Sequence, residues 1–441
     1  MNQVAAAATT ASGTPGRRRI IAGALGTAVA AAVHSTSARA APTGRKAVYL
    51  VPGYRAEAAR FRGMPADRAP ALRRSFPAAY DGGVTLVARI DERDGTIRRA
   101  LMPIVGHKIA VAPGGAMAVW SSMNGSGYVT FDPATLEFGR AFACDGAGFV
   151  GGGHAVYSND GSVLIATERK RAIGRPDSVA ALHGRLVVRD AVSFKVLASH
   201  DVQGMSPHDI ALTEDGRYAV VANYGSPPRL PGDASVAQFE PCITVIELAS
   251  GRMIDKRASP VGDGELRHLA MAGPQRAAVI CARQTTGVAA RAADDRDSIE
   301  EADFSVDEET YYRPAPVVWY DLARRDRPAI AALPDDPSLA RQGQSIVYDA
   351  RHDEVLVAFA SAHTVIVFAG LDGAVKRVIR TDRLGLRYPR GVELHPDGQH
   401  YVVSGSWQGL YQFRRGTHEL DTERCLHPVL FDHSHLTLLP A

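Results

Sequence analysis

Cysteine is scarce in this chain of 441 residues, which has four cysteines and no pair spaced as CxxC or CxxCH. Zinc ribbons, thioredoxin-like redox sites and c-type haem attachment depend on those spacings, so the sequence argues against all three. Two catalytic signatures are also missing: there is no G-x-S-x-G motif of serine hydrolases and no lysine after clustered glycines as in a P-loop. The triple glycine at residues 151–153 precedes an expected strand and not a helix, which excludes a dinucleotide-binding turn.

Beyond the first forty residues, the chain lacks an excess of either basic or acidic residues. The first forty contain four arginines and no acid, so the basic count falls from 50 to 46 against 47 acidic residues. No nucleic-acid footprint remains, and we expect no nucleic-acid partner. Beyond residue 40 no segment is apolar enough to anchor the chain in a membrane.

The first forty residues have the three parts of an export signal. Three arginines at positions 17–19 precede an uncharged apolar run over residues 20–33, and Ala38-Arg39-Ala40 follows as a cleavage site. The apolar run is shorter than the ~20 residues that span a bilayer. The arginines before a mildly apolar run resemble a twin-arginine signal; an ordinary secretory leader is the alternative. We predict a signal peptide over residues 1–40 and a mature periplasmic domain over residues 41–441.

A twin-arginine substrate folds before export in a reducing compartment, so we interpret the cysteines as buried apolar residues. A periplasmic disulfide is the alternative. The four positions are Cys144, Cys242, Cys281 and Cys425.

A repeat organises the mature chain. Its clearest copy is an alternating strand with an Asp-Gly turn over residues 208–216, an apolar strand over 218–222 and a third strand over 242–247. Asp-Gly after alternating apolar residues is a strong hairpin signal. Similar copies begin at residues 154 and 391, and looser copies without a clean Asp-Gly begin at residues 107, 268 and 345. Residues 46–105 hold strands enough for another.

Repeats of this length with four short strands each are typical of propeller blades. We therefore predict an all-β fold, a seven-bladed β-propeller in a single closed ring. Closure removes the exposed sheet edges, and residues 435–439 are the candidate closing strand beside the N-terminal blade. Two insertions interrupt the repeat: an acidic stretch at 288–313, interpreted as a solvated loop, and a proline-rich rim loop at 226–241.

Four consecutive blade starts carry a histidine: His107, His154, His208 and His268. Because the first strand of each blade surrounds the axis, the four imidazoles should converge at one mouth of the ring. Imidazole suits copper, iron, zinc and nickel, so these residues are the candidate metal ligands. Alternatively each ring is structural and bonded within its own blade.

A third alternative is a site for an anionic or polar organic ligand, with two arginines as its charged anchors. The candidate ligand-binding residues at the same mouth are Arg267, Arg390, Glu168, Asn223 and Gln284. Met205 is a further candidate metal ligand, although a methionine near a strand more often belongs to the core. We expect His433 and His435 to lie in a surface tail outside the site.

Several segments together resemble the domain-of-unknown-function 1513 family. They are the Gly-His pair at 106–107, residues 153–161 with Thr167-Glu168, residues 206–209 with 215–216 and 221–223, residues 266–270, and Pro389-Arg390-Gly391. The chain departs from the family pattern at Trp120-Ser121-Ser122 and at residues 226–229. The resemblance implies an exported seven-bladed propeller and a link to iron or other metal handling, because such proteins are often encoded beside iron-uptake and imelysin-like proteins.

The leading functional prediction is a periplasmic propeller that binds a metal ion or small ligand and serves in iron or other metal acquisition. A metal-dependent or redox enzyme using the same histidines is one alternative, and a protein-interaction platform in the envelope is another. The expected cofactor is a transition metal, namely copper, iron or zinc. The expected partners are envelope metal-uptake proteins, and we expect a monomer.

Overall fold

The structure is a computed structural model that describes residues 46–55, 85–104, 106–174, 176–228, 239–284, 312–405, 409–427 and 435–440. The predicted signal peptide lies outside these residues, as do His433, most of the acidic insertion and most of the rim loop. Backbone contacts group residues Ala41–Ala441 into one unit, to which all the described residues belong.

The described strands form seven antiparallel sheets. Each sheet is given from its innermost strand outward. The first sheet consists of β28 (Thr437–Pro440), β1 (Ala47–Arg55), β2 (Thr85–Asp91) and β3 (Ile97–Met102), and the second of β4 (Gly106–Val111), β5 (Ala118–Ser122), β6 (Gly127–Phe131) and β7 (Phe138–Ala143). The third sheet consists of β8 (Phe149–Tyr157), β9 (Val163–Lys170), β10 (His183–Asp190) and β11 (Val196–Met205).

The fourth to seventh sheets follow in the same order. The fourth sheet consists of β12 (Pro207–Leu212), β13 (Tyr218–Asn223), β14 (Cys242–Glu247) and β15 (Met253–Ala258), and the fifth of β16 (Glu265–Met271), β17 (Arg276–Gln284), β19 (Val317–Asp321) and β20 (Ile330–Ala332), with β18 (Tyr312–Arg313) paired to β17. The sixth sheet consists of β21 (Gly343–Asp349), β22 (Glu354–Phe359), β23 (Thr364–Ala369) and β24 (Val375–Arg380). The seventh consists of β25 (Pro389–Leu394), β26 (His400–Gly405) and β27 (Leu410–Arg414).

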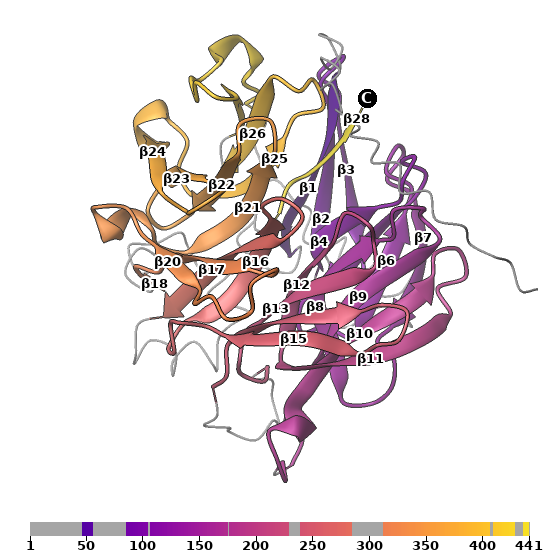
Figure 1. Cartoon of the computed structure of the whole chain (residues 1–441). Helices are drawn as coiled ribbons and strands as arrows, with labels where there is room; N and C mark the ends of the chain where they lie inside the picture. Colours follow the sequence, from indigo (N-terminus) through magenta and orange to yellow (C-terminus); the bar gives the residue numbers. More distant parts are fainter. Residues whose placement is uncertain are drawn as a thin grey trace, which may run out of the picture. The chain divides into compact units, whose positions relative to one another are not determined.

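Each innermost strand contacts the innermost strands of both neighbouring sheets, so the seven sheets are the blades of a closed ring. The predicted seven-bladed β-propeller is confirmed (Figure 1). The predicted closing strand is also confirmed: β28 pairs antiparallel with β1, with Val48 opposite Leu439 and Leu50 opposite Thr437, and completes the first blade from the far end of the chain.

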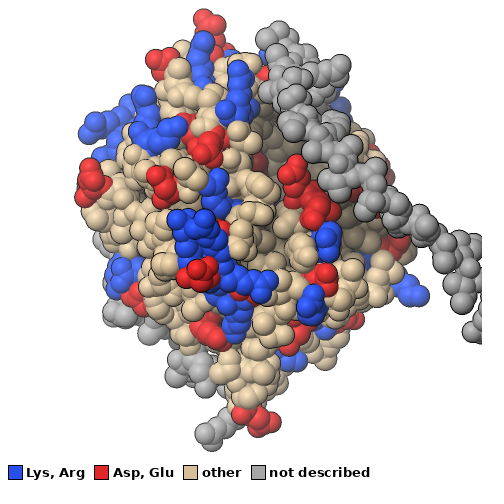
Figure 2. Space-filling view, viewed as in Figure 1, with Lys and Arg blue, Asp and Glu red and all other residues tan. Residues whose placement is uncertain are grey.

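Helix is nearly absent from the part of the chain that the structure describes. It contains four 3-10 helices of three residues each, at Ala180–Leu182, Pro337–Leu339, Asp382–Leu384 and Thr422–Arg424. None of the described helices has the length and apolarity needed to cross a membrane. Blue and red side chains are interspersed on the face drawn in Figure 2, in keeping with a net charge near zero.

The core lies between facing blades, where the middle strands present apolar side chains on both faces. In the fourth and fifth blades, for example, Val220 and Ile243 pack in one cluster with Val279 and Val318, and all four are almost fully buried. A strand buried on both faces loses the polar–apolar alternation of a surface strand, which explains the continuous apolar runs in β13, β17 and β22.

A buried polar network joins the last blade to the first. His395 Nε2 lies 2.9 Å from Glu92 Oε2, and His395 Nδ1 lies 3.1 Å from Asp397 Oδ2. The Arg424 guanidinium reaches both carboxylates, at 3.0 Å from Glu92 and 2.7 Å from Asp397. Burial raises the pKa of Glu92, but hydrogen bonds from His395, the Ala47 backbone and Gln412 outweigh burial and lower it to about 2.

The cysteines are all unpaired, as the interpretation of buried apolar residues requires. Cys242 and Cys281 are fully buried and belong to or adjoin the apolar core, while the other two are half-buried. Burial raises the pKa of both Cys242 and Cys281 to about 12, so neither is a reactive thiolate at neutral pH.

Candidate metal centre

The four predicted histidines lie on the innermost strands of four consecutive blades, β4, β8, β12 and β16. Their ring centroids are close together: 5.2 Å from His107 to His154, 4.5 Å from His154 to His208, and 4.8 Å from His208 to His268. The predicted convergence on one place beside the axis is therefore observed, although the residues are far apart in sequence.

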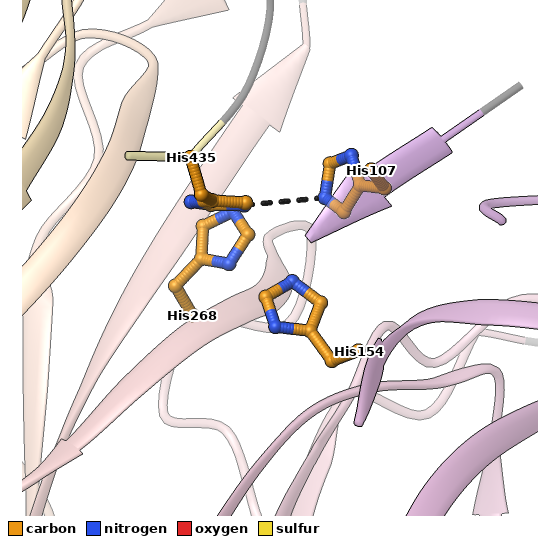
Figure 3. A group of neighbouring side chains, drawn as sticks. All are labelled: His107, His154, His268 and His435. Carbon is orange, nitrogen blue, oxygen red and sulfur yellow. Dashed lines mark hydrogen bonds between the residues drawn. The ribbon is translucent and has the colours of Figure 1, made fainter. Parts of the chain in front are cut away.

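A fifth histidine, His435, belongs to the same cluster, and the expectation that it lies in a surface tail is wrong. Its side chain is 3% exposed, and its ring centroid lies 4.3 Å from that of His268 and 4.8 Å from that of His107. His435 comes just before β28, so ring closure brings it to the axis beside the inner strands of the other blades (Figure 3).

The five rings are arranged as a plane of three with one ring on each side. His107, His154 and His268 form a triangle with centroid distances of 5.2, 5.2 and 6.2 Å. The His435 centroid lies 4.3–5.0 Å from all three corners, and the His208 centroid lies 4.5–5.0 Å from all three. On one side of the plane these two rings would overlap, so they must lie on opposite sides.

Four of the rings bring one nitrogen each into a common space. In the group His107, His154, His268 and His435 these nitrogens all lie within 4.8 Å of one another, and the Nε2 atoms of His107 and His435 are 3.2 Å apart (Figure 3). Tetrahedral ligation at 2.0–2.1 Å from a zinc-like ion places nitrogens ~3.4 Å apart. Small rotations of the rings would therefore complete a four-imidazole metal site.

Asp209, the residue after His208, forms a second layer of contacts behind the rings. Its Oδ1 lies 2.7 Å from His154 Nδ1, and its Oδ2 lies 3.8 Å from His268 Nδ1 and accepts a hydrogen bond from the Leu269 backbone at 3.0 Å. The electrostatic interaction with His154 and these hydrogen bonds outweigh the effect of burial and hold the pKa of Asp209 well below its usual range.

The contact with Asp209 decides which nitrogen of His154 is available. The carboxylate accepts a hydrogen bond from Nδ1–H, so in the neutral ring the lone pair is on Nε2. The Nε2 atom is buried and has no hydrogen-bond partner among the described residues. Metal-binding histidines in general donate their second ring N–H to a carboxylate or carbonyl in this way. A metal ion would supply the partner that His154 Nε2 lacks.

His208 shows the same pattern from the other side of the plane. Its Nδ1 lies 2.6 Å from the Gly152 carbonyl oxygen, which can only accept, so Nδ1 carries the proton. Its Nε2 is buried without a hydrogen-bond partner among the described residues, but it does not belong to the group of four converging nitrogens. That His208 is a metal ligand stays a prediction.

Burial favours the neutral form of three of the rings. Desolvation, followed by the repulsion of the neighbouring imidazoles, lowers the pKa of His208, His268 and His435 well below the usual value. Neutral imidazole is the form that binds metals. These three rings are therefore in the form that can ligate a metal at neutral pH.

Two glycines allow the close approach of the rings. Gly153 has a φ of +101°, and a Cβ at this position would lie 2.8 Å from His107 Cδ2 and 3.1 Å from His208 Cε1. A Cβ on Gly106 would overlap the ring of Trp120, which is fully buried beneath the start of β4. The Gly-His pairs in the sequence thus have a steric reason.

The predicted ligand-binding residues are mostly engaged with protein groups. Glu168, on the second strand of its blade, pairs with Arg185 at 2.7 Å and Arg189 at 3.4 Å. The Arg267 guanidinium pairs with Glu265 at 2.8 Å. Their role in ligand binding stays a prediction.

The remaining candidates lie elsewhere or outside the description. Asn223 donates from Nδ2 to the Cys242 carbonyl at 3.2 Å. Arg390 is buried on β25, and the side chain of Gln284 lies outside the described residues. Met205 is fully buried against Ala172 and Leu182, which places it in the apolar core.

A second group of potential ligands, Asp349, His352 and Glu354, is occupied by cations of the protein itself. The Asp349 carboxylate is paired with Arg415 and with His352, and the Glu354 carboxylate with Lys376. These ion pairs already neutralise the carboxylates, so this group is a structural network.

Residues 101–295 match the family model described as "Protein of unknown function (DUF1513)". This range includes the four predicted histidines and Asp209, and it confirms the resemblance of this segment to that family. No curated protein matches the chain.

Among solved structures the chain is similar to Kuenenia stuttgartiensis hydrazine synthase, with 13% identity and a TM-score of 0.52 over 79% of this chain and 94% of that chain. At this identity the likeness shows the fold alone. Because 1376 solved chains match, the comparison identifies a widespread fold and nothing narrower.

Proposed function

We propose that this chain is a metal-binding propeller of the periplasm, which holds one divalent transition-metal ion through His107, His154, His268 and His435. The observation that carries the proposal is the convergence of four imidazole nitrogens within 4.8 Å, in a buried place where His154 Nε2 has no hydrogen-bond partner among the described residues. Buried polar atoms nearly always find a partner, and an ion would supply one.

The donor set favours a particular class of metal. Imidazole nitrogens suit zinc, copper, nickel and ferrous iron, whereas hard ions such as calcium and magnesium take oxygen ligands. The carboxylate of Asp209 faces the outer nitrogens of two rings and is placed to orient them. Its negative charge also compensates part of the charge of the ion.

The cellular role follows from the leader and the metal site together. The arginines at 17–19, the apolar run after them and Ala38-Arg39-Ala40 support export to the periplasm. A buried imidazole site in an exported protein fits the acquisition of iron or another transition metal, in association with envelope uptake proteins.

The test is zinc binding by the purified mature chain, measured by isothermal titration. We expect one ion per chain, and we expect His154→Ala to weaken binding at least tenfold, or ~1.4 kcal/mol. His183→Ala is the matched control, because His183 lies in the same blade and faces the carboxylate of Asp201 at 3.5 Å without belonging to the cluster. Equal affinity in wild type and His154→Ala would remove the basis of the proposal.

A further inference from the structure

The C-terminal strand is the piece that completes the ring. β28 joins the first blade by a short pairing with β1, from Ala47 opposite Pro440 to Leu50 opposite Thr437. It also contacts β25 of the last blade and β4 of the second blade. A short terminal strand with few ladder bonds frays easily, so its attachment depends on what holds it from the other sides.

Side-chain contacts on the side of the second blade hold this segment in place. Thr437 Oγ1 donates to the Ile109 carbonyl at 3.0 Å, and Lys108 Nζ donates to the Leu436 carbonyl at 3.2 Å. On the other side, a Cβ on Gly391 would lie 2.6 Å from Leu436 Cβ, so the strand of the last blade approaches very closely. His435 is thereby positioned at the axis by contacts from both neighbouring blades.

Three of the four proposed metal ligands lie outside the segment that closes the ring. These three, His107, His154 and His268, come from the second, third and fifth blades, which one continuous segment of chain forms. The fourth, His435, comes from the segment that closes the ring. An ion bound to all four therefore connects the closing strand directly to three other blades.

Without an ion, the cluster that the seated strand completes contains a buried imidazole nitrogen that lacks a partner. His154 Nε2 is in this state, and desolvated polar groups without a hydrogen bond oppose burial. Bound metal converts this opposing contribution into ligation, which has all four imidazoles only when His435 is seated. By linkage, seating of the strand must then strengthen metal binding to the same degree that metal strengthens seating.

We propose that the metal ion stabilises the closed propeller ring, and we call this role the clasp. Because the ion binds His435, it holds β28 in the first blade, so that ring closure and metal binding are coupled. This rests on the proposed function. It adds that the state of the C-terminal strand reports whether the protein is loaded, so a partner that contacts this strand would distinguish loaded from empty protein.

Hydrogen exchange of the full mature chain with and without zinc tests the clasp. At zinc about 100-fold above its dissociation constant, exchange in residues 437–439 is expected to slow by up to ~100-fold. The reference is β22 of the sixth blade, which contributes no ligand and should slow less. His435→Ala is expected to abolish the extra slowing, and His427→Ala, an exposed histidine whose ring lies against Tyr411, is the control that should keep it.

The outcomes separate the two proposals. Zinc binding with equal slowing in β22 and β28, or with the same slowing in His435→Ala, overturns the clasp and leaves the metal site standing. Failure of the chain to bind zinc overturns both. Selective slowing at residues 437–439 that is lost in His435→Ala supports the coupling.

Discussion

Replacing Asp209 by asparagine isolates the contribution of the carboxylate behind the histidines. Oδ1 of Asp209 accepts from His154 Nδ1 at 2.7 Å and from the Ile210 backbone at 2.8 Å, and Oδ2 accepts from the Leu269 backbone at 3.0 Å. Both oxygens therefore face donors. An asparagine keeps the shape of the side chain but must place its NH2 group against one of these N–H groups.

The expected loss of metal affinity follows from this geometry. Disturbing a group that orients a metal-bound histidine in general costs 10–100-fold in affinity, or about 1.4–2.8 kcal/mol at 1.4 kcal/mol per tenfold. The variant also lacks the negative charge that faces His154 and His268, so we expect the upper part of this range. A donor facing a donor in a buried place should in addition lower the stability of the metal-free protein by roughly 1–3 kcal/mol.

The assay is competition between the protein and a chelator of known zinc affinity, with thermal unfolding in excess chelator as a separate measure of stability. The matched control is Asp201→Asn, because Asp201 also faces a histidine but is largely exposed and outside the cluster. If Asp209→Asn bound zinc as tightly as wild type, Asp209 would have no orienting role, and the assignment of Nε2 as the ligating atom of His154 would fail with it.

Three further predictions concern other parts of the chain. Gly153→Ala should weaken zinc binding at least tenfold and lower the melting temperature, because its Cβ would meet His107 in a backbone conformation that costs ~1–3 kcal/mol for other residues; wild-type affinity would contradict the packing argument. Glu92→Gln should lower the free energy of unfolding by up to about 3 kcal/mol at pH 7, since the pKa of Glu92 is lowered from 4.5 to about 2. Because the pKa is depressed in the folded state, the difference in stability between wild type and variant should fade as the pH falls from about 5 toward 2. A difference that is unchanged at low pH in denaturant titrations would refute this expectation. Arg17→Lys with Arg18→Lys should block delivery to the periplasm; normal export of the doubly substituted chain in a fractionation experiment would point to the general secretory route.

The sequence predicts most of the fold because the propeller repeats its local signals. Asp-Gly turns recur in the clearest copies and alternating strands in the looser ones, and the four histidines occupy equivalent places in that repeat. Ring symmetry then converts a sequence position into a position at the axis, so the convergence of His107, His154, His208 and His268 follows without any knowledge of side-chain conformation.

Two functional features were missed for reasons that are physical. His435 precedes a four-residue strand whose place depends on pairing with the other end of the chain, and its neighbours in sequence resemble a polar tail. The signal that was available is its position as the first residue of the expected closing strand, residues 435–439. Asp209 follows His208 directly, where the pairing of β12 with β13 is irregular between Pro207 and Asp209. A regular repeat does not predict its direction there, and it meets His154 and His268 from the neighbouring blades.

The number and type of metal-bound atoms test the central claim most directly. Zinc-loaded mature protein, measured by elemental analysis and by X-ray absorption at the zinc edge, should contain one ion per chain with nitrogen ligands at about 2.0–2.1 Å and the scattering pattern of imidazole rings. The simultaneous replacement of His107, His268 and His435 by alanine should remove the ion. Protein that stays free of metal after exposure to zinc, copper and nickel, or that binds zinc through oxygen atoms alone, would contradict the account.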